Sequence, residues 1–284
     1  MQKFFVLSLF LSLSEKTYAI DIYQYIIWKR YSDESGQIQN VSTNEFQKFL
    51  GKKRLKPIRV IYHSGFLTNG KPDPQKIKQI AAVSQKYPHI PVSFDIEIGN
   101  KFKPQTVLPI VNQTLNLYHQ YGGAAPVGVY GILPQSIFGS EYMHKNIEKE
   151  YISLNKNYES IAQKVDILSP VIYNLWFRDF NEWKRRVDHQ LSESQSYAKK
   201  YNLKIIPYFS STYLDKKYFK NRNNIIYPLT EQEMTQRLNY IRSKKVDGVI
   251  IWDPSGGILS NGNKPVFDIN KGAAKAILDF ANDQ

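Results

Sequence analysis

Short apolar runs alternate with longer segments of helical spacing along almost the whole sequence. The runs are rich in β-branched and aromatic residues and recur roughly every 35 to 40 residues. They cover residues 23–28, 59–63, 92–98, 128–132, 167–173, 204–209 and 248–253. Seven strands that alternate with helices predict an α/β fold, in which a parallel sheet is covered by helices.

The segments between the runs carry the signals of helix ends. Asp73-Pro74 is typical of a helix start, and Gly122-Gly123 is typical of a helix end. Thr230 and Glu233 have the spacing of a capping box, which indicates a further helix start. We also expect helices over residues 179–201 and 270–281, which completes the alternation.

Two arrangements of such a sheet compete, an open doubly wound sheet and a closed barrel. An open nucleotide-binding sheet has a Gly-rich turn after its first strand, whereas Lys29-Arg30-Tyr31 follows the first run here. A length of 284 residues also fits one barrel. We therefore predict a distorted TIM-like (β/α) barrel of seven to eight parallel strands, formed by residues 20–284 as a single domain.

Residues 1–19 have the pattern of a secretory signal peptide. Lys3 precedes an apolar run that extends to Leu13, and Ala19 is a small residue before the expected cleavage at Ile20. The run is shorter than the roughly 20 apolar residues that span a membrane, and no later stretch is long enough. We expect a secreted or periplasmic protein with no integral membrane segment after cleavage; an N-terminal strand or a retained anchor is the alternative.

The composition narrows the chemistry and the partners. The chain has no cysteine, which excludes disulfides, thiolate metal sites and cysteine nucleophiles, and its five histidines lack metal-ligand spacing. We therefore expect neither a metal nor a cofactor. The formal net charge of +13, which removal of residues 1–19 lowers by one, favours anionic partners. Because no nucleic-acid recognition motif accompanies this charge, we expect an anionic polysaccharide as the partner of a monomeric protein.

In a parallel barrel the active site lies at the carboxyl ends of the strands. Nearly every predicted strand ends in an aromatic residue, and aromatic rings stack on the apolar faces of sugars. The candidate substrate-binding residues at these ends are Tyr62, Tyr130, Asn174, Tyr208 and Trp252, and Tyr173 is a candidate catalytic residue. Packing in the barrel core is the alternative role for each aromatic residue.

The run 92–98 ends in two carboxylates, Asp95 and Glu97. The period of two along a strand places both on the inner face, while Phe94, Ile96 and Ile98 face the helices. Paired acids are what glycosidic bond cleavage requires. Like charges this close raise at least one pKa, and Glu97, nearer the strand end, is the candidate proton donor. The alternative is an ion pair inside the barrel, for which Arg59 is the main basic candidate.

Asp95-Ile96-Glu97 resembles the Asp-x-Glu signature of glycoside hydrolases that use the substrate's own acetamido group, the hyaluronidases (family 56) and the chitinases (family 18). Three further motifs occur in the order found in hyaluronidases. Residues 127–131 resemble their Gly-Tyr/Phe-Tyr-Gly strand, residues 168–173 their Pro-Ser-Val-Tyr strand, and residues 247–252 their Asp-Gly-Ile-Ile-Ile-Trp final strand. The resemblance spans about residues 20–280 and implies a distorted seven-stranded barrel.

The resemblance also implies a role for each site residue. Glu97 would protonate the leaving oxygen and later deprotonate water, while Asp95 would orient the acetamido group and stabilise the cyclic intermediate. Tyr173 would donate a hydrogen bond to the acetamido oxygen, Tyr130 would line the same pocket, and Trp252 would form the floor under the sugar. The implied activity is that of a secreted endo-β-N-acetylhexosaminidase similar to hyaluronidase.

The sequence also departs from both families. Residues 98–104 lack the Trp and Arg that usually follow the catalytic Glu of hyaluronidases, and the disulfides of that family are absent. Ser93 stands where chitinases have an earlier Asp. Two alternatives stay open: a non-catalytic carbohydrate-binding barrel, and a family 18-like chitinase or peptidoglycan glycosidase.

Overall fold

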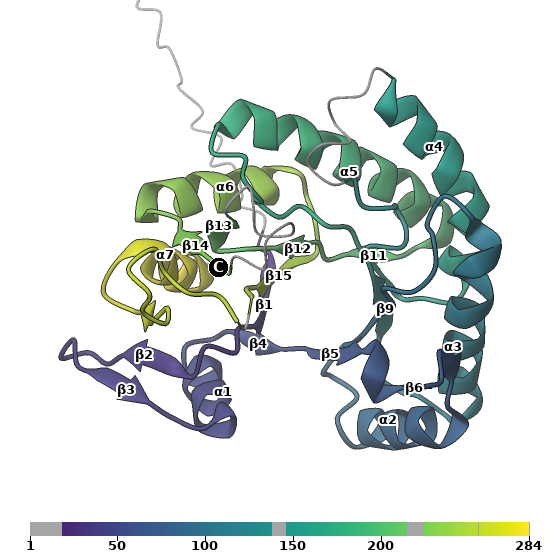
Figure 1. The fold of residues 1–284 in the computed structure, drawn as a ribbon, viewed down its shortest axis with the longest axis horizontal. Helices are drawn as coiled ribbons and strands as arrows, with labels where there is room; N and C mark the ends of the chain where they lie inside the picture. The colour runs from purple at the N-terminus through teal and green to yellow at the C-terminus, as the bar shows by residue number, and fades with distance from the viewer. Residues whose placement is uncertain (1–18, 138–145, 215–223, 255, 284) are drawn as a thin grey trace, which may run out of the picture.

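The computed structural model describes residues 19–137, 146–214, 224–254 and 256–283. Except for Ala19, the predicted signal peptide lies outside these ranges. The described chain forms a mixed α/β fold in which helices surround two parallel sheets (Figure 1).

The two main sheets contain only parallel pairs. One has the order β12-β15-β1-β4, and the other has the order β11-β10-β9-β8-β5. Their bounds are β1 Asp21–Tyr25, β4 Lys56–Pro57, β5 Arg59–Tyr62, β8 Val92–Asp95, β9 Val127–Tyr130, β10 Ile167–Ser169, β11 Lys204–Ile205, β12 Tyr208–Phe209 and β15 Gly248–Trp252. The prediction of a parallel α/β architecture is confirmed.

Two short interruptions separate one sheet from the other. Only Ile58 lies between β4 and β5, and only residues 206–207 lie between β11 and β12. The second segment bonds to both sheets, because Ile206 N donates to Leu168 O at 2.9 Å and Ile250 N donates to Pro207 O at 2.8 Å. With each interrupted segment counted as one strand, the pairings connect seven parallel strands in the cyclic order expected of a barrel.

The helices lie outside the strands and begin close to the predicted positions (Figure 1). Asp73 caps the helix that begins at Pro74, and the capping box of Thr230 and Glu233 is complete. The helix before Gly122-Gly123 is preceded by a 3-10 turn at Pro104–Thr106 and becomes α-helical at Leu108. The helices are α1 Thr43–Lys52, α2 Pro74–Lys86, α3 Leu108–Gln120, α4 Ile147–Tyr158, α5 Phe180–Tyr201, α6 Glu231–Ser243 and α7 Gly272–Asn282, with 3-10 turns His63–Gly65, Pro104–Thr106 and Glu159–Gln163.

Small sheets decorate the loops around this frame. β2 Arg30–Ser32 lies between β3 Ile38–Asn40 and β16 Phe267–Asp268. Two antiparallel pairs add β6 Leu67–Thr68 with β7 Lys71–Pro72, and β13 Thr212–Leu214 with β14 Ile226–Pro228. None of these elements, nor α1 and α4, follows from the alternation that predicts the main strands.

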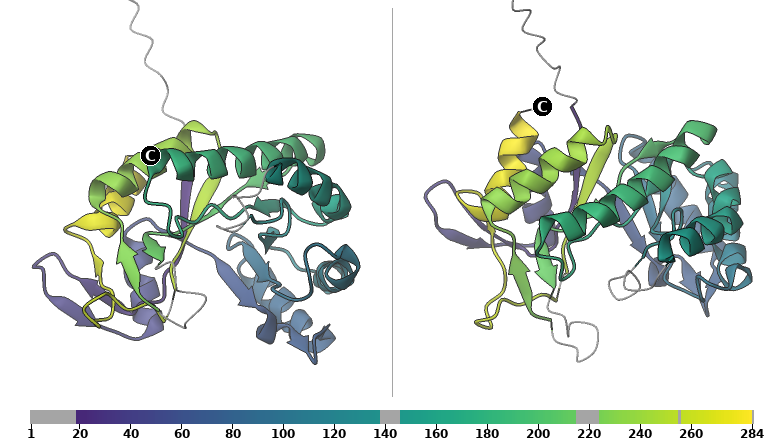
Figure 2. Two further views of the ribbon diagram at one scale, coloured as in Figure 1. Left: turned by 45° about the horizontal axis from the view of Figure 1, so that its top comes forward. Right: turned by 90° about the horizontal axis from the view of Figure 1, so that it is seen from above.

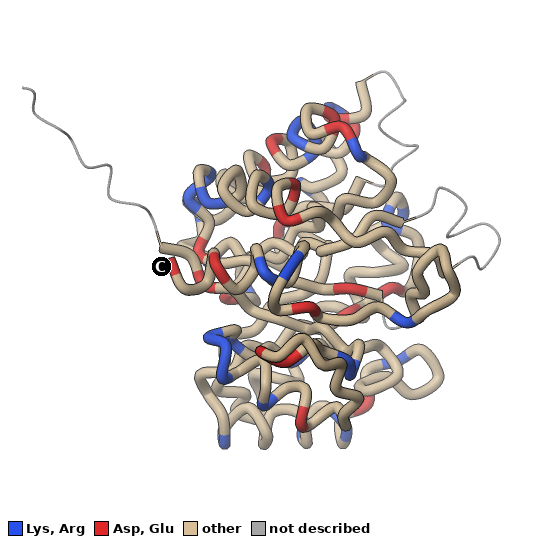
Figure 3. The backbone as a smooth tube through the Cα atoms, turned by 90° about the vertical axis from the view of Figure 1, so that its left-hand side faces the viewer, with Lys and Arg blue, Asp and Glu red and all other residues tan. Residues whose placement is uncertain are grey.

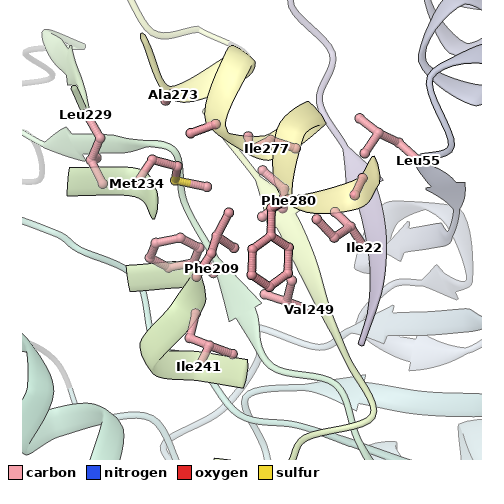
Figure 4. Packing of buried hydrophobic residues seen from close by; sticks show 14 of the residues in the cluster. Ile22, Leu55, Phe209, Leu229, Met234, Ile241, Val249, Ala273, Ile277 and Phe280 are labelled. Carbon is pink, nitrogen blue, oxygen red and sulfur yellow. The ribbon is translucent and has the colours of Figure 1, made fainter. Parts of the chain in front are cut away.

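The core is divided by the strands into inner and outer parts. Figure 4 shows the outer cluster in which Ile22 of β1 and Val249 of β15 pack against Met234 of α6 and Ile277 of α7. This packing holds the C-terminal helix beside the first strand (Figures 1 and 2). A separate cluster lies between the strands and contains Tyr208 with other residues near the strand ends. The outer packing fixes the strands, and this inner cluster lies at the ends where the candidate site is expected.

Charged residues of both signs are interspersed along the described chain in the view of Figure 3. Among the described residues, no helix combines the length and hydropathy needed to cross a membrane.

Candidate active site

The parallel register places several predicted site residues at one edge of the fold. Tyr62 at the end of β5 pairs with Asp95 at the end of β8, and Tyr130 of β9 pairs with Ser169 of β10. On the other sheet, Trp252 of β15 pairs with Tyr25 of β1. Because all these strands are parallel, their carboxyl ends meet on the same side of the molecule.

Asp95 is the buried member of the acidic pair. All four residues of β8 are buried, and Phe94 points outward to make edge contacts with Phe66 and Tyr118, at ring distances of 5.0 and 5.8 Å. The alternation along the strand therefore turns Asp95 inward. Asp95 is only 7% exposed, and its Oδ1 atom has no hydrogen-bond partner. Burial, and then the charge of Glu97, raise the pKa of Asp95 to about 7.

Glu97 is exposed, because β8 ends at Asp95 rather than at the predicted position 98. The chain turns at Gly99, whose φ is +83° and where an added Cβ would lie 2.6 Å from Thr106 O. The glycine thus permits a turn that carries Glu97 out of the sheet. The sequence predicted at least one raised pKa in this pair, and the pKa of Asp95 is raised.

Neither carboxylate of this acidic pair takes part in an ion pair with the described residues. None of their ion pairs includes Asp95 or Glu97. Arg59, the basic residue considered from sequence, instead places its guanidinium 5.0 Å from the centre of the Tyr87 ring. The described residues therefore give no support to the ion-pair alternative for the two carboxylates.

Aromatic side chains from five strand ends gather around the carboxylates. The rings of Tyr173 and Trp252 stack 5.2 Å apart at 28°, and Trp252 Nε1 donates to Tyr62 Oη at 3.2 Å. Tyr130 makes an edge contact with Tyr208 at 4.9 Å. Burial is the largest cause of the raised pKa values of Tyr130, Tyr173 and Tyr208, and the charge of Asp95 raises them further. These phenols are therefore protonated hydrogen-bond donors at neutral pH.

The predicted residues differ in how accessible they are. Glu97 is exposed, Tyr62, Tyr130 and Trp252 are partly buried, and Tyr173 is 7% exposed. Tyr208 is fully buried and donates from its hydroxyl to Ser93 Oγ at 2.8 Å. Asn174 is also fully buried and donates from Nδ2 to Ser210 O at 2.6 Å. The structure thus places Tyr208 and Asn174 in the wall behind the site.

Two contributors were not identified from sequence. Tyr25 packs edge-on against Tyr62 at 6.1 Å, and the period of two along the first run would have placed it on the inner face. The second contributor is helix α5, which fixes the chain at Tyr173. Trp183 Nε1 donates to Ile172 O at 3.0 Å, and Arg186 Nη1 donates to Tyr173 O at 3.1 Å. A side chain from a distant helix leaves no local signal of such a contact.

A cavity of about 260 Å³ lies beside Glu97. Its lining includes Glu97, Tyr130 and Gly131, together with Gln135 and Lys101. Lys101 Nζ donates to Ser136 O at 2.8 Å, so this side chain is tied to the cavity wall. The cavity offers space for a ligand next to the exposed carboxylate.

The described residues contain no group of three His, Cys, Asp or Glu side chains that could hold a metal ion. The donors at the strand ends are two carboxylates, several phenols and one indole, which is a set suited to acid–base chemistry rather than to metal binding.

No protein-family model matches the sequence, and no curated protein is significantly similar to it. Solved structures are similar in fold. Bee venom hyaluronidase has a TM-score of 0.59 and 16% identity over 94% of this chain and 98% of that chain. The Bacillus cereus spore cortex-lytic enzyme SleL has a TM-score of 0.46 and 11% identity, over 91% of this chain and 67% of that chain. The Rhizomucor miehei chitinase RmChi1 has a TM-score of 0.42 and 8% identity, over 91% and 93%.

The similarity to the hyaluronidase supports the predicted fold class for nearly the whole chain. At 16% identity it shows the fold alone.

Proposed function

We propose that the protein is a glycoside hydrolase that cleaves β-linked N-acetylhexosamine polymers with retention of configuration. The observation that carries the proposal is the pair Asp95 and Glu97, without a cationic partner in the described chain, at strand ends lined with aromatic rings. The fold similarity to a bee venom hyaluronidase and the order of the sequence motifs support it.

In the proposed reaction the substrate's acetamido oxygen is the nucleophile. It forms a bond to the anomeric carbon as the glycosidic bond breaks, and Glu97 gives its proton to the leaving oxygen. Water then attacks the anomeric carbon and opens the cyclic intermediate, while Glu97 takes a proton from this water. Two displacements at one carbon retain the β configuration.

Asp95 responds to the charge that this reaction creates. The neighbouring oxazolinium ring is positive, so its formation favours the ionised form of Asp95 and opposes the burial that raises its pKa to about 7. The unpartnered Oδ1 atom is available to the acetamido nitrogen. Asp95 therefore interacts more strongly with the intermediate than with the neutral substrate, as catalysis requires.

The aromatic residues have separate proposed roles. The Tyr173 hydroxyl stays protonated and donates to the acetamido oxygen, while Tyr130 lines the same pocket. Trp252 forms the floor under the reacting sugar, with Tyr62 holding its indole nitrogen. Tyr208 and Asn174 support these residues from behind.

Substrate and location are part of the same proposal. The net charge of +13 favours an anionic glycosaminoglycan over a neutral polymer, and the pattern of residues 1–19 favours export to the periplasm or the medium. We propose a monomer with one catalytic domain over residues 20–284 that acts without cofactor.

Release of reducing ends from hyaluronan, chondroitin, chitin oligomers and peptidoglycan tests the function. Glu97→Gln should abolish release but keep binding, and Glu150→Gln on exposed α4 is the matched control that should stay active. Binding by the natural protein without release between about pH 4 and 8 would instead identify a carbohydrate-binding barrel. If the natural protein neither binds nor cleaves any of these polymers, both functions are refuted.

A further inference from the structure

Asp253 lies directly after Trp252 at the end of β15 and is completely buried. Its Oδ1 atom accepts hydrogen bonds from Ser211 N at 3.0 Å and from Thr212 Oγ1 at 2.9 Å. Its Oδ2 atom accepts from Ser211 Oγ at 2.6 Å. None of the ion pairs among the described residues includes Asp253. The carboxylate is therefore held by one segment, residues 210–212, which is distant in sequence.

The 210–212 segment continues this network to the chain after β10. Ser210 O accepts from Asn174 Nδ2 at 2.6 Å, and Ser210 Oγ accepts from Asn174 N at 3.3 Å. Ser210 Oγ also donates to Thr212 O at 3.0 Å. The 210–212 segment and its hydrogen bonds thus connect Asp253, which follows Trp252, to Asn174, which follows Tyr173.

The sheets do not set the relative positions of these two rings directly. Tyr208 of β12 pairs with Ile250 of β15 and also accepts from Ile172 N at 2.9 Å, so the segments that carry the two rings are joined only through β12. The 210–212 segment follows the strand that lies between them. It is placed to fix the 5.2 Å stacking of Tyr173 on Trp252.

We propose that Asp253 is a positioning residue that sets the stacking of Trp252 on Tyr173 by anchoring the 210–212 segment. The effect on turnover rests on the proposed function, whereas the effect on the position of the rings does not.

The energetics of Asp253 support a role other than fold stability. Burial raises its pKa to about 7, although the hydrogen bonds from Ser211 and Thr212 act in the opposite direction. An acid with a raised pKa in the folded state makes the protein less stable as the pH rises from about 4 to 7. An apolar side chain would avoid this cost if packing were the only requirement.

Fluorine NMR of protein labelled with 5-fluorotryptophan tests the proposal without any substrate. Trp252→Phe identifies the Trp252 resonance among the four tryptophans. Asp253→Ala should shift and broaden this resonance, because the anchor is lost. Asp253→Asn should stay close to the natural protein, because the amide can accept at Oδ1 and donate from Nδ2 to Ser211 Oγ. The control is Asp188→Ala on α5, which removes contacts to Lys184 and Lys244 away from the site.

A double-mutant cycle separates positioning from a general loss of stability. The double variant Ser211→Ala with Thr212→Val removes the two hydroxyl donors to Asp253 and keeps the Ser211 N–H, and it should shift the Trp252 resonance as Asp253→Ala does. Combined with Asp253→Ala it should add little further shift, since both changes break the same bonds. If Asp253→Ala does not fold, the Ser211 and Thr212 variant alone provides the test. An unchanged Trp252 resonance in a folded variant, or a shift equal to that of Asp188→Ala, would overturn the proposal.

Kinetics give a second readout if the protein hydrolyses a polymer. Asp253→Ala should lower kcat about 10- to 100-fold with a much smaller change in KM, since misplacement of groups around the reacting atoms affects the chemical step. Asp253→Asn should restore most of kcat, and Asp188→Ala should leave kcat unchanged. A larger effect of Asp253→Ala on KM than on kcat contradicts the proposal. Absence of hydrolysis in the natural protein refutes the proposed function but leaves the fluorine test decisive.

Discussion

Substitution of Asp95 by Asn should make the folded protein more stable at alkaline pH. Burial raises the pKa of this carboxyl from an ordinary value of 3.8 to about 7 in the folded state. Below about pH 4 the carboxyl is protonated in both states. As the pH rises toward 7, the unfolded chain loses this proton first, so the free energy of unfolding falls by about 1.4 kcal/mol per pH unit. The total loss attributable to Asp95 is about 4 kcal/mol, complete above about pH 7.

Urea denaturation of the natural protein and of Asp95→Asn at pH 5, 6, 7 and 8 measures this effect. The free energies of unfolding of the two proteins should differ less at pH 5 than at pH 8. At pH 8 Asp95→Asn should be the more stable protein by up to about 4 kcal/mol. Asp253→Asn should show a similar change, because burial also raises the pKa of Asp253 to about 7. Asp283→Asn, at the exposed C-terminal end of α7, is the control and should keep the natural pH dependence. Equal slopes for Asp95→Asn and the natural protein between pH 5 and 7 would show that Asp95 is not a buried acid of raised pKa.

Four further predictions concern the site. Glu97→Gln should lower kcat by about 10² to 10⁴, while a competition assay shows unchanged glycan binding. Proton NMR of fresh product from the natural protein should show the β anomer first, and an initial α anomer contradicts the acetamido mechanism. Tyr173→Phe should weaken the inhibition constant of a thiazoline mimic of the cyclic intermediate more than it raises KM, and equal changes would assign Tyr173 to ground-state binding. The acid limb of the kcat/KM profile should lie near pH 7 and that of kcat somewhat lower, because the acetamido N–H of bound substrate donates to Asp95 and so favours its ionised form; coincident limbs in a pH–rate study contradict this. Arg186→Met should lower the free energy of unfolding by about 1–3 kcal/mol per carbonyl left unpaired, and an unchanged urea midpoint would refute the anchoring role.

The main strands could be predicted because each is a short run of apolar, β-branched or aromatic residues whose side chains alternate between two faces. Phe94 and Ile96 face the helices and Asp95 faces inward, as the period of two requires. The small sheets escaped prediction because their stability comes from contacts across long separations. β16, for example, pairs with β2 through Phe267 and Tyr31, and no local pattern announces such a pairing.

The spacing of residues in the sequence could not predict which site residues are exposed and which are buried. The spacing placed Glu97 nearer the strand end than Asp95, but it did not show that the strand ends at Asp95 and that the turn at Gly99 exposes Glu97 fully. Asn174 follows a strand end, where the sequence predicts contact with substrate, yet Ser210 packs over it. That contact joins two segments that are 36 residues apart in the sequence, so no local pattern shows it. Residue type and strand order thus predicted which side chains meet at the strand ends, and tertiary packing decided which of them are accessible.

The two buried acids show how the site and the frame oppose each other. Asp95 and Asp253 each lie at or just beyond the carboxyl end of a parallel strand, and each has a pKa raised by burial to about 7. Both therefore destabilise the fold as the pH rises through the range in which they ionise. The outer apolar clusters between strands and helices offset this cost, because they pack on the opposite faces of the same strands. Since the proposed reaction needs ionised Asp95 beside a positive intermediate, catalysis favours the upper end of this range whereas stability favours the lower end. The working pH of such an enzyme would lie where these opposing requirements overlap, and a variant that widens the stable range without touching the strand ends would extend activity toward higher pH.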